Sequence, residues 1–126
     1  MTVLQAWECT LPVRIVSVAN LREHWATKAR RTREQRATAR ICVRAEIGPA
    51  APAGLYRVTI TRQGGKRLDP HDNLPMSCKA IVDGIAEAMG IDDGSPCIEW
   101  VYAQGSAPRG RHSARVRIER VSAEGV

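Results

Sequence analysis

The chain of 126 residues contains no phenylalanine, and aromatic residues make up only 4% of it. Trp7, Trp25 and Trp100, together with abundant Val, Ile and Ala, therefore have to fill a modest core. No apolar run approaches the roughly 18 residues of a membrane span, and the N-terminus lacks a signal-peptide pattern. We therefore expect a single domain over residues 1–126, located in the cytoplasm and without a membrane partner.

Several motifs of known chemistry are also missing. The chain has no G-x-S-x-G, no phosphate-binding P-loop and no dinucleotide fingerprint, so we expect no small-molecule cofactor. Its cysteines, Cys9, Cys42, Cys78 and Cys97, form no C-x-x-C pair. A zinc site would need the tertiary fold to gather them, and buried free thiols are the expected alternative.

Acidic residues are scarce outside one window. The net charge is +6 at pH 7, yet residues 69–93 contain six of the 13 acidic residues and a single base. This window carries a charge of −5 while the remaining residues sum to +11. A carboxylate cluster inside a cationic protein is typical of a metal-dependent enzyme that acts on a polyanion.

The same window predicts an amphipathic helix over residues 73–89. Six apolar residues share one face of the helical wheel, whereas Asp72, Lys79 and Asp83 share another. Asp72 or Asn73 is expected to cap the N-terminus, and Gly90 is expected just past the C-terminus. The six apolar positions are Leu74, Cys78, Ile81, Val82, Ile85 and Met89.

The rest of the chain predicts a small domain of α/β (α+β) class. The expected order is β-α-β-α-β-β, with a mixed sheet and two helices. The first strand, or two pieces bent at Pro12, lies within residues 3–18, and Asn20 is expected to cap a helix that extends to Ala45. Alternation of apolar and polar residues predicts further strands at 55–62, 97–104 and 115–121, the last two as an antiparallel hairpin.

The first predicted helix is strongly basic. Between Asn20 and Ala45 the chain has eight Lys or Arg residues but only two acidic residues, Glu23 and Glu34. The apolar stripe of this helix is thin, mostly alanine with Trp25 and Ile41. Such a helix either neutralises DNA phosphates or is an ordinary solvated helix, and the excess of base favours phosphate binding. The candidate DNA-binding residues are Arg22, Lys28, Arg30, Arg31, Arg33, Arg36, Lys66 and Arg67.

The acidic window also contains candidate metal ligands. Mg²⁺ binds carboxylate and water oxygens, and Asp69, Asp72, Asp92 and Asp93 are the candidates, with Lys79 beside them to stabilise charge on a phosphate. A 17-residue helix would be about 25 Å long and would separate the two pairs of acids unless folding or a second subunit brought them together. The alternative roles are a helix cap at Asp72, a polar turn at 92–93 and an i, i+4 ion pair between Lys79 and Asp83. His71 joins the metal ligands, acts as a base or is a solvent-facing loop residue.

Three segments together resemble the RusA family of Holliday junction resolvases. They are Asp69-x-x-Asp72-Asn73-Leu74, then Lys79-Ala-Ile-Val-Asp83-Gly-Ile, then Ile91-Asp92-Asp93, and the likeness covers residues 66–104. Residues 11–25 and the basic helix are similar, more loosely, to phage-type members. Two residues separate Asp69 from Asp72, where the family pattern has one. Three additional residues, Pro75 to Ser77, precede Lys79.

The resemblance implies a RusA-like fold and a homodimeric endodeoxyribonuclease that uses Mg²⁺, or Mn²⁺, to cut branched DNA. Asp69, Asp72, Lys79 and Asp93 match the catalytic positions, and in this family the acids gather around a cleft at the dimer. We therefore expect a Holliday junction resolvase-like enzyme of recombination, repair or phage DNA processing. The alternatives are a catalytically inactive DNA-binding protein of the same fold and a purely structural basic domain.

Overall fold

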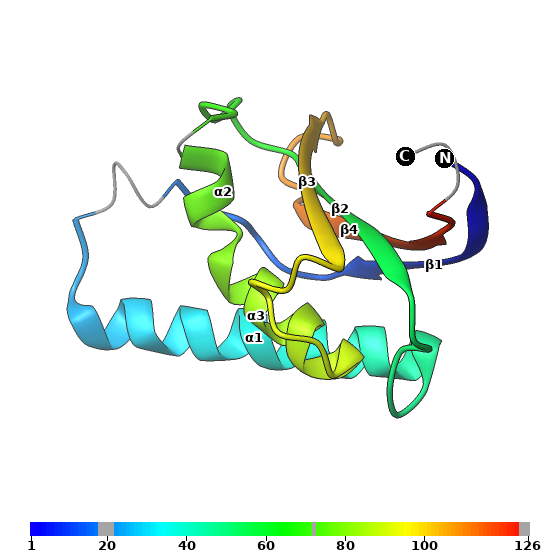
Figure 1. The fold of residues 1–126 in the computed structure, drawn as a ribbon. Helices are drawn as coiled ribbons and strands as arrows, with labels where there is room; N and C mark the ends of the chain where they lie inside the picture. The colour runs from blue at the N-terminus through cyan, green and yellow to red at the C-terminus, as the bar shows by residue number, and fades with distance from the viewer. Residues whose placement is uncertain (18–21, 72, 124–126) are drawn as a thin grey trace.

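A computed structural model describes residues 1–17, 22–71 and 73–123. It confirms an α+β domain with a mixed four-stranded sheet, and it contains three helices instead of two (Figure 1). In chain order the elements are β1 (Val3–Leu11), α1 (Trp25–Ile47), β2 (Leu55–Gln63), α2 (Asn73–Ser77), α3 (Lys79–Met89), β3 (Ile98–Gly105) and β4 (Ser113–Val121). No helix in these described ranges is long and apolar enough to cross a membrane.

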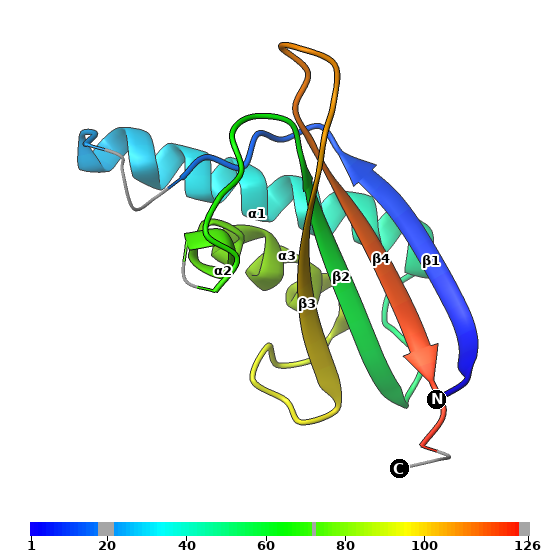
Figure 2. The ribbon, with the colours of Figure 1, turned by 90° about the horizontal axis from the view of Figure 1, so that it is seen from above.

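The sheet has the strand order β1-β4-β2-β3, which overturns the predicted hairpin of the last two strands (Figure 2). β4 pairs antiparallel with both β1 and β2, whereas β3 lies at the edge and pairs parallel with β2. Parallel neighbours need a crossover, and α2 and α3 supply it between β2 and β3. Alternation along a strand reveals which face is buried but not which strand lies next to it, so the pairing was not determined by the pattern.

Helices α1 and α3 pack against one face of the sheet (Figure 1). Tyr56, Val58 and Ile60 of β2 point into this core, as their alternation predicted. The predicted apolar stripe of residues 74–89 is confirmed, because all six of its members are buried. Of the four cysteines, all of them free thiols, only Cys78 is buried, and Cys97 is exposed, so the prediction of buried thiols is correct for one of them.

Helix α1 begins later than predicted and buries different residues. Asn20, the predicted cap, lies outside the described residues; the cap is His24, whose Nδ1 accepts a hydrogen bond from the Ala26 N–H at 3.2 Å. Trp25 and Ile41 are exposed, so they do not form the core-facing stripe. The buried residues are instead Gln35, Ala39 and Val43, one per turn of the helix.

The predicted helix over 73–89 has the expected ends but is interrupted at Cys78. The Cys78 N–H is shared between the carbonyl oxygens of Leu74 and Pro75, both at 3.2 Å, which tightens the chain between α2 and α3. Gly90 has the left-handed conformation (φ 71°) that favours glycine after a helix, as predicted.

Helices α1 and α3 approach each other closely at Gly84. A Cβ atom at this position would lie 2.3 Å from the Arg36 carbonyl oxygen and 2.9 Å from the Ala39 Cβ. On the exposed rim of this contact, Glu87 accepts hydrogen bonds from Arg36 and Arg40. The close approach fixes α3, and with it the candidate site at its first turn.

Candidate functional site

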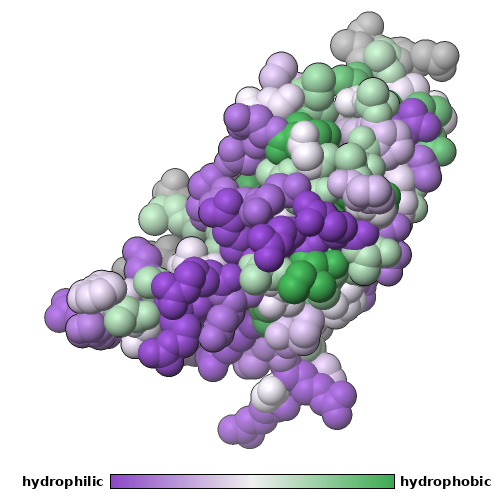
Figure 3. Space-filling model, turned by 90° about the horizontal axis from the view of Figure 1, so that it is seen from below, coloured by the Kyte–Doolittle hydropathy of each residue, from purple (hydrophilic) through white to green (hydrophobic). Residues whose placement is uncertain are grey.

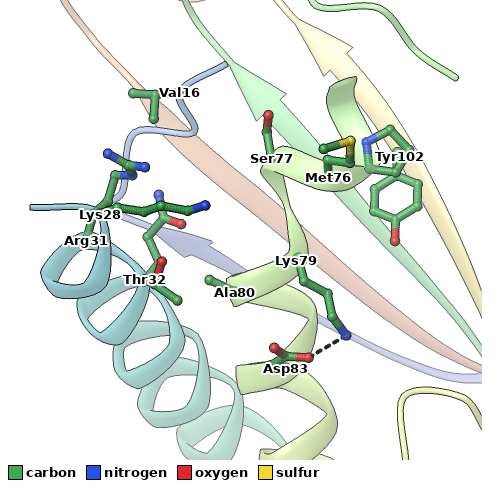
Figure 4. A pocket seen from close by; sticks show the side chains of 12 residues that line it. Val16, Lys28, Arg31, Thr32, Met76, Ser77, Lys79, Ala80, Asp83 and Tyr102 are labelled. Carbon is green, nitrogen blue, oxygen red and sulfur yellow. Dashed lines mark hydrogen bonds and ion pairs between the residues drawn. The ribbon is translucent and has the colours of Figure 1, made fainter. Parts of the chain in front are cut away.

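The candidate site is built around Lys79, the first residue of α3. Its ammonium Nζ donates to Asp83 Oδ1 at 2.8 Å, one turn further along the helix (Figure 4). It also donates to Asp93 Oδ2 at 2.5 Å, from the loop after the helix. We call these three residues the Lys79 cluster. The i, i+4 ion pair expected between Lys79 and Asp83 is therefore present, and a second carboxylate joins it.

Asp93 reaches Lys79 because the chain folds back after α3. The Ile91 N–H donates to the Ala86 carbonyl, which turns the chain at the helix end. The Trp100 Nε1 donates to the Asp93 carbonyl oxygen at 2.9 Å and anchors this loop to β3. The interruption at Cys78 leaves α3 only 11 residues long, so the separation expected for one straight helix does not apply to Lys79 and Asp93.

The charges in this cluster reinforce one another. Hydrogen bonds to Asp83 and then to Asp93 raise the pKa of Lys79 above its ordinary value. In return the hydrogen bond from Lys79 lowers the pKa of Asp93. At neutral pH the ammonium and the Asp93 carboxylate are therefore both charged, and 61% of the Lys79 side chain is exposed to solvent.

A groove of about 610 Å³ borders the cluster, between the first half of α1 and the segment containing α2 and α3. Lys28 and Arg31 line its α1 side, while Lys79 and Asp83 line the opposite side (Figure 4). Glu23 holds the Arg31 guanidinium in place through two hydrogen bonds of 2.6 and 2.7 Å. The other lining residues are Val16, Thr32, Gln35, Pro75, Met76, Ser77, Ala80 and Tyr102.

Asp69 lies elsewhere. It lines a second cavity, and within the described ranges only Val16 lines both that cavity and the groove. Its Oδ1 accepts the His71 N–H at 3.0 Å and its carbonyl accepts the Leu74 N–H at 2.8 Å, so Asp69 forms the turn that leads into α2. The His71 side chain is exposed.

The remaining acids of the predicted metal site do not complete it. Asp92 is exposed, and its Oδ1 accepts the Gly94 N–H at 2.8 Å, as expected of a polar turn. Asp72 lies outside the described residues. Among the residues that the structure describes, no group of three or more His, Cys, Asp or Glu side chains is arranged to hold a metal ion.

The predicted DNA-binding residues fall into three groups. Arg31 and Arg36 are engaged in ion pairs with Glu23 and Glu87. Lys66 and Arg67 lie in the loop after β2 and line the second cavity. Arg22, before α1, and Lys28, Arg30 and Arg33, in its first turns, make no ion pair with any described residue.

The surface on the side of α1 is mainly hydrophilic, in a broad band flanked by apolar patches (Figure 3). α1 lies on this side of the molecule, and its arginines and lysines are mostly exposed. Two of these basic residues, Lys28 and Arg31, line the groove.

Sequence reasoning missed several contributors to the site. Tyr102 lines the groove, and burial raises the pKa of its hydroxyl. The alternation of residues along β3 placed Tyr102 on the same side of the strand as Ile98 and Trp100. It did not predict the groove beside Tyr102. Arg14 and Arg62 line the second cavity, and no motif in the sequence marked either of them.

Comparison of the chain with models of known protein families and with curated proteins found no match.

Proposed function

We propose that this protein is an endodeoxyribonuclease that binds branched DNA, including four-way junctions, and hydrolyses a phosphodiester bond beside the Lys79 cluster. The observation that carries the proposal is the meeting of Lys79, Asp83 and Asp93, from two separate segments, at the edge of a groove with cationic residues on its other side. The likeness of the same segments to RusA-type resolvases supports it.

The described residues have defined parts in this proposal. Lys28 and Arg31 bind phosphates of the strand in the groove, and the tethered Arg31 is the more rigid of the two. Lys79, kept protonated by its two carboxylates, stabilises negative charge that develops on the phosphate during hydrolysis.

Magnesium is the proposed cofactor, with Asp93 and Asp72 as the carboxylates assigned to it. The described part of the chain does not contain a complete metal site, so Asp72 is needed for this assignment. Bound Mg²⁺ supplies polarisation of the phosphate and a more acidic water. A homodimer, also proposed, would bring a second copy of the cluster to the other strand.

The second candidate function is binding of branched DNA without cleavage. It is favoured by the engagement of Asp93 with Lys79 and of Asp69 with the turn before α2. Both carboxylates then have structural partners, and the cationic groove retains its affinity for phosphates.

Incubation with a synthetic four-way junction, with and without Mg²⁺, tests both candidates. We expect paired nicks in Mg²⁺ and their loss in Asp93→Asn and Asp72→Asn, each with unchanged junction binding. Glu99→Gln, an exposed carboxylate on β3, is the matched control and should cleave normally. Binding without cleavage by the unsubstituted protein would establish the second candidate, and absence of binding at low salt would refute both.

A further inference from the structure

The second cavity, of about 600 Å³, collects four basic residues from one strand and two connections of the chain. Arg14 comes from the segment after β1, Arg62 from the end of β2, and Lys66 and Arg67 from the loop that follows β2. We call it the Arg62 pocket. Its other lining residues are Val16, Ser17, Gly65, Leu68, Asp69 and Asn73.

Arg62 is the unusual member, because it is buried with only 7% of its surface exposed. Its Nε donates to the Ile15 carbonyl at 2.9 Å and its Nη1 donates to the Lys66 carbonyl at 2.8 Å. These hydrogen bonds fix the guanidinium but leave its charge uncompensated, since both acceptors are neutral carbonyls. Arginine is almost never this buried unless an anion pairs with it.

The third nitrogen of this guanidinium is left accessible by a glycine. A Cβ atom at Gly65 would lie 2.8 Å from Arg62 Nη2, so any other residue would crowd this nitrogen. Gly65 also has φ +77°, which other residues rarely adopt. No described residue accepts a hydrogen bond from Nη2.

The surroundings of the Arg62 pocket favour a negative ligand. Burial lowers the pKa of Arg62, and the neighbouring positive charge of Arg14 lowers it further, while Cys78 acts in the opposite direction. Arg14, Lys66 and Arg67 make no ion pair with any described residue. Asp69 is the one carboxylate among the described lining residues, and its Oδ1 accepts the His71 N–H.

We propose that the Arg62 pocket is a phosphate-binding site, in which Arg62 Nη2, Arg14 and Arg67 bind the oxygens of one phosphate group. We assign this group to the DNA backbone, an assignment that rests on the proposed function. Val16 lines both the pocket and the groove, so the two adjoin, and a strand that lies in the groove can extend to the pocket. A free phosphate has the same chemistry and is the other source to be tested.

The first test uses inorganic phosphate and needs no DNA. Titration at constant ionic strength, with chloride as the reference anion, should shift the Arg62 Nε–H resonance and raise the melting temperature saturably. Arg14→Ala and Arg67→Ala should reduce both effects at least several-fold. Arg115→Ala, an exposed arginine of β4, removes the same charge elsewhere and should not. No shift at Arg62, or equal losses in all three variants, would overturn the proposal.

The second test identifies the source of the phosphate. Arg14→Ala and Arg67→Ala should weaken binding to a four-way junction. Each should also reduce the slope of log K against log salt by about 0.9 for each phosphate that is no longer neutralised. Arg115→Ala should leave both the affinity and the slope unchanged. Binding of inorganic phosphate with no effect on DNA binding would overturn the assignment to DNA and identify a free-phosphate site. Phosphate and DNA binding at the pocket without cleavage would overturn the nuclease proposal alone.

Discussion

At the scale of single residues, the Lys79 ammonium connects two carboxylates that are ten residues apart in the sequence, Asp83 and Asp93. The pair to Asp83 is local, whereas the pair to Asp93 holds the loop after α3 against the start of that helix. Because the side chains are partly exposed, solvent screening limits what they add to stability. Their main effect is to fix the position and the charge of Lys79.

The pairing predicts a pH-dependent contribution to stability. Since the pKa of Asp93 is lowered, its contribution is present above the ordinary value of 3.8 and is lost as pH falls below it. Since the pKa of Lys79 is raised, its contribution is present below the ordinary value of 10.5 and is lost as pH rises through its higher value in the folded protein. The melting temperature of Lys79→Met should therefore fall furthest below that of the unsubstituted protein between about pH 5 and 9. Lys66→Met is the control, and a difference that is constant across pH would contradict the prediction.

At the scale of secondary structure elements, the contact between α1 and α3 positions the site. Gly84 allows the backbones to approach, and Ala39 supplies the facing small residue. Glu87 then links α3 to two arginines of α1. The basic helix and the helix with the Lys79 cluster are held against each other by this contact, and the groove between them depends on it.

Gly84→Ala is expected to destabilise the protein by about 1–3 kcal/mol, because the added methyl group would overlap the Arg36 carbonyl and force the helices apart. Urea denaturation measures the change. Gly105→Ala is the matched control, since its Cβ would meet only Thr61 Cγ2 at 3.8 Å, an ordinary contact. Equal stability of the two variants would mean that the close approach of the helices is not required.

At the scale of the whole molecule, the net charge of +6 is distributed unevenly. Lys28 borders the groove without an ion pair to any described residue, and unpaired basic residues also surround the Arg62 pocket. On the sheet face away from the helices, by contrast, Arg57 and Arg117 pair with Glu119. An attractive field for a polyanion is therefore expected on the side of the groove and the pocket.

The uneven charge predicts salt-dependent DNA binding through one side of the molecule. A triple alanine variant of Lys28, Arg30 and Arg33 should lower the slope of log K against log salt by about 0.9 for each phosphate that these side chains neutralise in the unsubstituted protein. A triple alanine variant of Arg109, Arg111 and Arg115 has the same charge and should bind nearly as the unsubstituted protein does. Similar losses in both variants, measured by fluorescence anisotropy, would show that net charge alone determines the affinity.

The fold was predictable where a local pattern was strong. β2 alternates over its whole length, and the apolar stripe of residues 74–89 identified the buried face of α2 and α3. Prediction failed where the outcome depended on distant partners. Trp25 and Ile41 were expected to face the core as part of the apolar stripe of the first helix, but α1 turns Ala39 and Val43 toward α3 and the sheet instead. The predicted hairpin of β3 and β4 was wrong, because β4 pairs with β1 and β2.

The sequence by itself determined the acidic window, the basic helix and the Lys79–Asp83 pair, because charge and helical spacing are properties of neighbouring residues. Only the tertiary structure decided that Asp93 returns to Lys79, that Asp69 lines a different cavity, and that Arg62 is buried beside three other bases. These outcomes depend on how loops fold back between strands and helices. Side chains far apart in the sequence meet there through packing, which spacing along the chain does not encode.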